Sequence, residues 1–278
     1  MRSSDISPKA LESLKTSRIK RVIITGRRGP LQSAFTTKEL REILAIPEMR
    51  FKTDPKLLDE QIAEATEYLS TNRPKKRLVE LIRKGALQTA SKCSKSLEML
   101  YNANPAGFRL DSTGSVSNII LQRTVLQGQV PDVKCVGTKE FFDIDCGLVI
   151  KSVGFNTEPL EGLPFDEGKN RYFNDRGKVK GVPGLYVSGW LKSGPVGVIA
   201  STMYDAFETA DTILMDSPTL ISSEKQGLTN EEISSLGATS FADWESLDTA
   251  ELKRGKEAGK ARVKVESIEE MVSIMRDT

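Results

Sequence analysis

Two adjacent arginines follow the first strand-like segment of the chain. Residues 21–25 (Arg-Val-Ile-Ile-Thr) have the β-branched composition of a strand, and Gly26 leads directly to Arg27 and Arg28. In an open α/β sheet, ligands bind beyond the carboxyl ends of the strands. Guanidinium groups bind phosphate oxygens bidentately and stay charged at any working pH. The pattern predicts a site for a phosphomonoester such as the 2′-phosphate of NADP, and a solvated basic turn is the alternative.

The residues after this turn predict helices that position it. Thr36 and Glu39 have the spacing of a capping box, which predicts a helix from there to about Ile46. Residues 54–55 (Asp-Pro) predict the start of the next helix, since Asp is a good N-cap and Pro fits the first helical position. Another helix is expected over about 74–87, with its cations mostly outward.

The remainder of the chain predicts strands first and then a helix. Alternating polar and apolar residues over 108–136 predict antiparallel strands. Buried strands are expected at 146–150 and 184–188, and a helix is expected to begin near Gly197. The chain after Ser217 reads as polar and loop-rich, ending in a short amphipathic helix around 268–275.

Composition excludes several kinds of site. The chain of 278 residues has no histidine and three cysteines without a C-x-x-C pattern, so histidine-based catalysis is excluded and a metal site is not expected. No apolar run approaches the roughly 18 residues that span a bilayer. Residues 1–153 carry 26 Lys and Arg against 17 Asp and Glu, whereas residues 154–278 carry 14 against 21. A basic half of this kind predicts an anionic partner or cofactor.

Longer motifs resemble one family. Residues 26–32 (Gly-Arg-Arg-Gly-Pro-Leu-Gln), 72–78 (Asn-Arg-Pro-Lys-Lys-Arg-Leu), 182–190 (Val-Pro-Gly-Leu-Tyr-Val-Ser-Gly-Trp) and 194–200 (Gly-Pro-Val-Gly-Val-Ile-Ala) are similar to segments of the adrenodoxin reductases, the mitochondrial NADPH–ferredoxin reductases. The resemblance covers almost the whole chain. It implies an enzyme in which FAD passes electrons from NADPH to an iron–sulfur ferredoxin.

The resemblance also assigns cofactor-binding residues. It implies that Arg27 and Arg28 bind the 2′-phosphate of NADP and that Glu39 helps to hold the same nucleotide. A capping-box role alone would also explain Glu39. The residues expected at the flavin are Trp190, Gly197, Val198 and Ile199. No residue is expected to act as acid, base or nucleophile, because the cofactors carry the chemistry.

A partner-binding surface follows from the same resemblance. Arg41, Arg73 and Arg77 match basic residues that face an acidic [2Fe-2S] ferredoxin in the family. Nucleic acid is not expected on this surface, since no aromatic residues interleave with the cations as single-strand binders require. The family implies a mitochondrial location, in the matrix or at the periphery of the inner membrane, without a transmembrane segment.

The family's two dinucleotide fingerprints are missing from the sequence. No G-x-G-x-x-G or G-x-G-x-x-A run occurs in it. The expected fold is therefore α/β with two incomplete Rossmann-like nucleotide-binding domains. Residues 1–153 are expected to form the remainder of the NADP-binding domain, and residues 154–278 the C-terminal part of the FAD-binding domain. The chain is expected to look N-terminally truncated, to fold marginally and to bind FAD poorly alone.

Two other functions stay open at this point. A shortened paralogue could act as a non-catalytic binding module through its basic face. Another FAD- and NADPH-dependent oxidoreductase, similar to the small subunit of glutamate synthase, would share the nucleotide-binding motifs. The cations over residues 73–84 favour an acidic protein acceptor instead.

Overall fold

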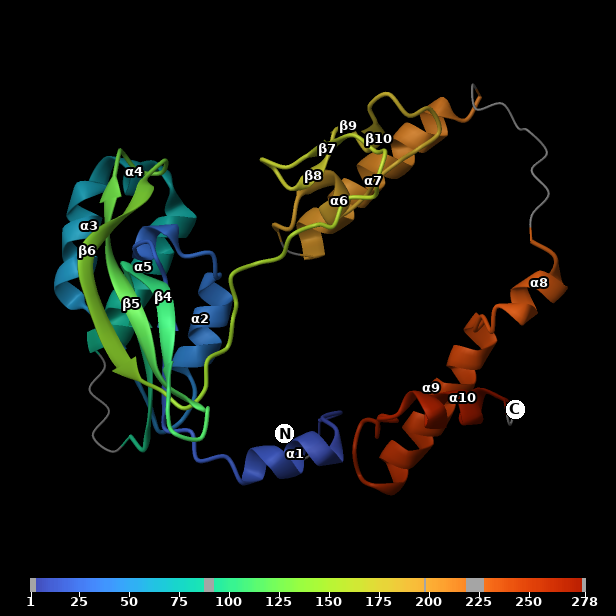
Figure 1. Cartoon of the computed structure of the whole chain (residues 1–278), viewed down its shortest axis with the longest axis horizontal. Coiled ribbons are helices and arrows are strands. Elements are labelled where there is room, and N and C mark those ends of the chain that lie inside the picture. The colour runs from blue at the N-terminus through green and yellow to red at the C-terminus, as the bar shows by residue number, and fades with distance from the viewer. Residues whose placement is uncertain (1–3, 88–92, 198, 219–227, 277–278) are drawn as a thin grey trace. The chain divides into compact units, whose positions relative to one another are not determined.

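The computed structural model describes residues 4–87, 93–197, 199–218 and 228–276 (Figure 1). The chain divides into two compact units, one made of Met1–Val149 with Glu245–Thr278 and the other of Ile150–Trp244. Parallel and antiparallel sheets occur together with helices, so the predicted α/β class is confirmed. The expected division into an NADP-binding and an FAD-binding domain after residue 153 stays a prediction.

A three-stranded parallel sheet forms the centre of the first unit. Its strand order is β1-β3-β2, with β1 at one edge. The bounds are β1 Arg21–Thr25, β2 Met49–Thr53 and β3 Lys95–Leu100. Of these strands only β1 was predicted. Each of the other two is short, and β2 alternates basic with apolar residues, which gives no continuous apolar run.

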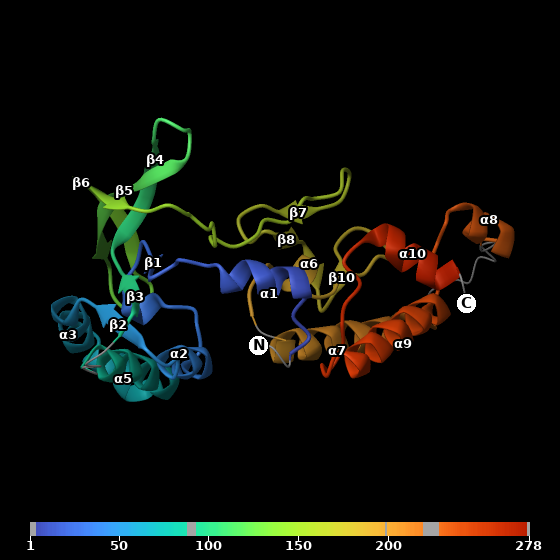
Figure 2. The same cartoon turned by 90° about the horizontal axis from the view of Figure 1, so that it is seen from below.

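Helices α2, α3 and α5 lie on one side of this sheet (Figure 2). The elements between β1 and β3 are η1 Pro30–Gln32, α2 Thr37–Leu44, α3 Pro55–Glu64, α4 Thr66–Thr71 and α5 Arg73–Leu87. The predicted caps are confirmed, since Thr36 caps α2 and Asp54 caps α3. The core between helices and sheet contains Leu40, Leu58 and Ile82, all buried. Burying such side chains stabilises the fold by about 1.5–3 kcal/mol each.

The outer strand β1 has an open edge and an uncovered face. Val22 and Ile24, which alternate along it, are each 45% exposed. Side chains at i and i+2 of a strand point to the same face. That face of β1 therefore presents apolar side chains to solvent.

A long antiparallel meander follows the parallel sheet. The strands are β4 Ala103–Leu110, β5 Val116–Gln127 and β6 Lys134–Asp145, with β5 in the middle. This confirms the antiparallel strands predicted over 108–136. Pairing is irregular between Gln122 and Thr124, where β6 has two more residues than β5, and such a register shift bends the strand that carries the extra residues.

Helices at the two ends of the chain also belong to the first unit, which includes α9 from Glu245 onward. They are α1 Pro8–Lys15, α9 Phe241–Glu257 and α10 Ile268–Arg276. Lys264 pairs with Asp5 at 3.1 Å, and Arg262 pairs with Asp248 and Glu251 of α9. The terminal helix was predicted. The expectation of loops after Ser217 was wrong for two segments, the short helix α8 (Asn230–Ser235) and α9, whose apolar residues are too sparse for a clear helical period.

The second unit has short strands and one long helix. Its elements are β7 Phe165–Asp166, β8 Arg171–Tyr172, β9 Asn174–Asp175, β10 Lys178–Val179, α6 Trp190–Ser193, α7 Ile199–Asp216 and α8 Asn230–Ser235. Tyr172, Val179 and Val187 form its small core. The helix predicted from near Gly197 is confirmed and begins at Ile199.

Two predicted strands are absent from the described residues. Residues 146–150 form no strand, and Leu148 and Ile150 are exposed instead of buried. Residues 184–188 form one isolated bridge, between Tyr186 and Lys178. Both segments have strand composition, but neither forms a ladder with a described strand: residues 184–188 meet only the two-residue strand β10, at one bridge. Composition alone therefore misassigned them.

Candidate functional site

The turn after β1 is held by hydrogen bonds to its backbone. The carbonyl oxygen of Arg27 accepts one from the Thr124 hydroxyl at 2.7 Å and another from the Cys135 thiol at 2.9 Å. Thr124 lies on β5 and Cys135 on β6. The meander therefore fixes the position of Arg27, more than 90 residues earlier in the chain.

The connection between β3 and β4 holds the same turn from its other side. The amide of Gly26 donates to Leu100 at 2.9 Å, and the carbonyl of Gly26 accepts from Ala103 at 3.0 Å. The amide of Asn102 donates to the carbonyl of Arg28 at 3.2 Å. These bonds satisfy the backbone of the turn and leave both arginine side chains exposed. No carboxylate of the described residues forms an ion pair with Arg27 or Arg28.

Gly29 follows the arginines because no side chain fits there. A Cβ at this position would overlap the amide group of Gln61, a buried side chain of α3. The amide nitrogen of Gly29 donates to Gln32 at 3.2 Å, which closes the turn into η1. The glycine thus lets the chain pass close to α3 directly after the arginine pair.

Lys75 adds a third cation beside this turn. Its Nζ donates to the carbonyl of Ser33 at 2.7 Å. Burial, and secondarily the positive charge of Arg28, hold the pKa of Lys75 below its ordinary value. Lys75 does not stand out in the sequence, since it lies within a basic run. Its partly buried position in the first turn of α5 distinguishes it from its exposed neighbours.

Glu39 is the closing residue of the capping box on α2. Its carboxylate accepts from the Thr36 amide at 2.6 Å and from the Thr36 hydroxyl at 3.0 Å. The amide of Glu39 donates back to that hydroxyl at 3.3 Å. The hydrogen bond from the Thr36 backbone, followed by that from its hydroxyl, lowers the pKa of Glu39. The capping role is confirmed, and the predicted contact with a nucleotide stays a prediction.

The three arginines predicted to bind a partner lie on two neighbouring helices. Arg41 is on α2 and Arg73 and Arg77 are on α5, and these two helices pack against each other. All three side chains are exposed. Arg73 and Arg77 are four residues apart, which places them on one face of α5. Their role in partner binding stays a prediction.

The second predicted site lies where α6 and α7 begin. The ring of Trp190 is half exposed and packs at a tilt against Phe155, with centroids 5.6 Å apart. Gly197 has φ +102°, and a Cβ there would lie 2.5 Å from the hydroxyl of Ser201. Ile199, the first residue of α7, is 90% exposed. The remaining predicted residue, Val198, lies outside the described residues.

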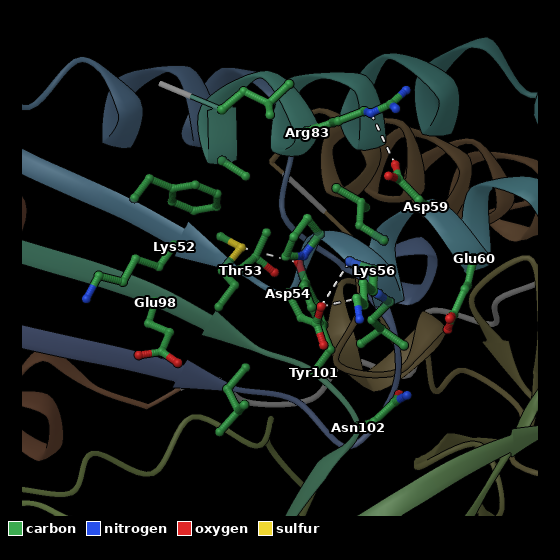
Figure 3. A pocket seen from close by; sticks show the side chains of 18 of the residues that line it. Lys52, Thr53, Asp54, Lys56, Asp59, Glu60, Arg83, Glu98, Tyr101 and Asn102 are labelled. Atoms are coloured by element: carbon green, nitrogen blue, oxygen red, sulfur yellow. Dashed lines mark hydrogen bonds and ion pairs between the residues drawn. The ribbon is translucent and has the colours of Figure 1, made fainter. Parts of the chain in front are cut away.

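A cavity of about 850 Å³ opens at the carboxyl ends of β2 and β3 (Figure 3). Thr53 and Asn102 line it, and the Oγ1 and Oδ1 atoms of these residues are buried without a hydrogen-bond partner among the described residues. Arg83 and Asp59 pair at 3.1 Å on its wall. None of the predicted site residues lines this cavity.

The described residues contain neither a metal site nor a membrane-spanning helix. No group of three or more His, Cys, Asp or Glu there could hold a metal ion. Within those same residues, no helix is long and apolar enough to cross a membrane.

Known sequences similar to this chain are reductases. The NADPH:adrenodoxin oxidoreductase of Salvelinus fontinalis is 40% identical over 99% of this chain and 58% of that protein. The human protein of the same name is 36% identical over 98% of this chain and 58% of its own length. The NADPH-ferredoxin reductase FprA of Mycobacterium leprae is 31% identical over 98% and 60%. No protein-family profile matches the chain.

Solved structures of the reductase FprA are also similar to this chain. Mycobacterium tuberculosis FprA, solved in complex with NADPH, matches with a TM-score of 0.83 and 30% identity over 99% of this chain and 62% of that one. The chain thus spans about three fifths of the length of the relatives it matches. The resemblance read from the motifs is confirmed. Nearly all of this chain is therefore related to one part of the proteins of the NADPH:adrenodoxin oxidoreductase family.

Proposed function

We propose that this chain functions as an NADPH:ferredoxin oxidoreductase, in which electrons pass from NADPH through FAD to an iron–sulfur ferredoxin. The observation that carries the proposal is the anchored Arg27–Arg28 turn at the carboxyl end of β1. Relatives with this name match nearly the whole chain.

The arginine turn suits the 2′-phosphate that distinguishes NADPH from NADH. Hydrogen bonds hold the backbone of the turn on both sides, so the two guanidinium groups extend from a fixed backbone. Neither forms an ion pair within the described chain, and Lys75 adds positive charge beside Arg28. Planar guanidinium groups bind phosphate oxygens in pairs. Arg27 and Arg28, with Lys75 beside them, therefore fit the 2′-phosphate of NADPH.

The α6–α7 region suits the flavin. Gly197 gives backbone access where a side chain would meet Ser201, and α7 follows directly with an exposed first residue. The amide groups at a helix N-terminus carry partial positive charge, which stabilises an anionic ring edge. Trp190 supplies an apolar surface beside them. When bound, FAD would accept a hydride and release single electrons. The chain's own residues would hold and orient it.

The proposed partner is an acidic [2Fe-2S] ferredoxin. Arg41, Arg73 and Arg77 offer exposed positive charge on packed helices, which would steer an acidic protein and give salt-sensitive docking. The proposed location is mitochondrial, which the names of the eukaryotic relatives state for those proteins. Within the mitochondrion, we propose the matrix or the periphery of the inner membrane.

The decisive experiment compares two ligands on three proteins. Isothermal titration calorimetry of the chain with adenosine 2′,5′-bisphosphate and with AMP measures the contribution of the 2′-phosphate alone to the binding affinity. We expect the chain to bind the bisphosphate about 10–100-fold more tightly, since a charge-assisted bidentate contact contributes about 1.5–3 kcal/mol. Arg27→Ala with Arg28→Ala should abolish this difference, while Lys139→Ala on β6 should keep it. Equal affinities for both ligands in the unmodified chain would refute the proposal.

A further inference from the structure

A buried lysine lies beside the proposed flavin region. Lys192, in α6, is only 5% exposed. Its ammonium group lies 3.0 Å from Asp205 Oδ1 and 2.7 Å from Glu208 Oε2, and it donates to the Asp205 carbonyl at 2.9 Å. Lysine has three N–H donors, so these three acceptors use all of them.

The carboxylate of Asp205 connects this lysine to the start of α6. Its Oδ2 accepts the Gly189 amide at 2.9 Å, while its Oδ1 faces Lys192. Gly189 has φ +61°, a left-handed conformation that favours glycine, and it directly precedes Trp190. Asp205 therefore fixes a strained turn at one end and the buried ammonium at the other.

The turn is also held from the strand side. The side-chain amide of Asn174 donates to the Lys192 carbonyl at 2.9 Å, and the backbone amide of Ser193 donates to the Gly189 carbonyl at 3.0 Å. The Thr209 hydroxyl of α7 donates to the Val187 carbonyl at 3.2 Å. All these contacts lie within the unit formed by Ile150–Trp244.

We propose that Lys192 is a positioning residue, which, together with Asp205 and Glu208 of α7, clamps the turn of residues 189–194 so that Trp190 and the start of α7 are held ready for a flavin. This inference rests on the proposed function for the identity of the ligand. The clamp itself rests only on contacts of the chain.

The charges explain why one lysine has this effect. A buried ammonium is tolerated only when its charge and its donors are fully partnered. The ammonium in turn lowers the pKa of Glu208, through its hydrogen bond first and its charge second, so that this carboxylate stays ionised. Without the lysine, the two carboxylates of α7 would lose the group that neutralises them, and residues 189–194 would lose their two ion pairs and one hydrogen bond to α7. We therefore expect residues 189–194 to separate from α7 while the helix persists.

The test uses tryptophan fluorescence, because the chain has only two tryptophans. In a Trp244→Phe background, Trp190 is the only indole. Lys192→Met should raise the acrylamide quenching constant of Trp190 about twofold through local opening of the turn, with the helical circular dichroism unchanged. The matched control is Arg176→Met, which removes the exposed partner of the same Glu208 at 3.5 Å. It should leave Trp190 quenching as it was.

Further variants keep the proposal open to refutation. Lys192→Arg keeps the positive charge and should protect Trp190 more than Lys192→Met does. If Lys192→Met does not fold, Lys192→Arg and Asp205→Asn decide, with Trp190 protected in the first and more quenched in the second. Unchanged quenching in a folded Lys192→Met, or equal quenching in the Arg and Asn variants, overturns the proposal.

These measurements need no flavin. Addition of FAD to the Trp244→Phe chain, in which Lys192 is unchanged and Trp190 is the only indole, tests the proposed function separately through Trp190 fluorescence. If FAD leaves that signal unchanged at any concentration, the flavin assignment fails, while the quenching results still decide whether the clamp exists.

Discussion

The hydroxyl of Thr124 donates a hydrogen bond of 2.7 Å to the carbonyl oxygen of Arg27, across a sequence separation of 97 residues. Thr124 is 5% exposed and lies in the middle strand of the meander. Together with the thiol of Cys135 on the next strand, it positions the turn from which the arginine pair projects. The meander therefore belongs functionally to the proposed phosphate site, although it supplies none of the cations there.

Replacing Thr124 by valine tests this link. The change keeps the side chain's shape and removes the donor, so the Arg27 carbonyl keeps only the weaker thiol donor. We expect about 1 kcal/mol less stability, and affinity for adenosine 2′,5′-bisphosphate about threefold to fivefold lower, with AMP binding unaffected. Urea unfolding and titration calorimetry measure the two effects. Full bisphosphate affinity in a destabilised variant would mean that the hydrogen bond is structural only.

Lys75 gives a second prediction at the same site. Its partly desolvated ammonium lies near Arg28, so a bound phosphate would relieve the repulsion between the two cations. Lys75→Met should weaken bisphosphate binding about fivefold, with a smaller salt dependence, while Lys76→Met on the exposed side should have little effect. Calorimetry at two salt concentrations measures both. Equal losses in the two variants would show that only net charge matters.

Elements that are determined by residues adjacent in the sequence were predicted correctly. The strand Arg21–Thr25 and the caps at Thr36 and Asp54 are present as expected. Other strands were misassigned because a strand needs a partner: β3 was missed although it pairs on both sides, whereas the more apolar residues 146–150 form no ladder with a described strand.

The site was predicted only in part for a related reason. Arg27 and Arg28 could be found because a strand, a glycine and two guanidinium groups follow one another in the sequence. Thr124 and Lys192 could not, since each acts through contacts with residues that the fold brings near: Arg27 for the first, Asp205 and Glu208 for the second. No local pattern distinguishes a clamping lysine from an exposed one.

The capping box on α2 makes the stability of the first unit depend on pH. The pKa of Glu39 is lower in the folded chain than its ordinary value, so its contribution is complete above the ordinary value and is lost as pH falls toward the folded value. Glu39→Gln keeps a capping residue but removes the ionisation. We expect urea midpoints of this variant to fall less between pH 6 and pH 3 than those of the unmodified chain. Glu42→Gln, outside the capping box, is the matched control, and identical pH profiles for the Glu39 variant and the unmodified chain would contradict the prediction.

The exposed arginines of α5 should control partner binding. Arg77→Glu reverses one charge on the face shared with Arg73, and we expect the affinity for an acidic [2Fe-2S] ferredoxin to fall about tenfold at low salt. Lys139→Glu makes the same charge change on β6, away from these helices, and should cost much less. Surface plasmon resonance at several salt concentrations separates the two. Equal effects would show that the partner responds to overall charge and not to this surface.

The open edge of β1 should make the chain self-associate. Val22 and Ile24 are each 45% exposed on a strand that has no neighbour on one side among the described strands. Such edges pair with other chains, and a lysine placed among their apolar side chains prevents this. Val22→Lys should therefore lower light scattering at high protein concentration, while leaving the circular dichroism spectrum unchanged. Val125→Lys, an equally exposed apolar position, is the matched control, because β5 lies between β4 and β6 and Val125 itself pairs with Val136 of β6. If both substitutions reduce scattering equally, general surface hydrophobicity drives association, and the edge of β1 has no special part in it.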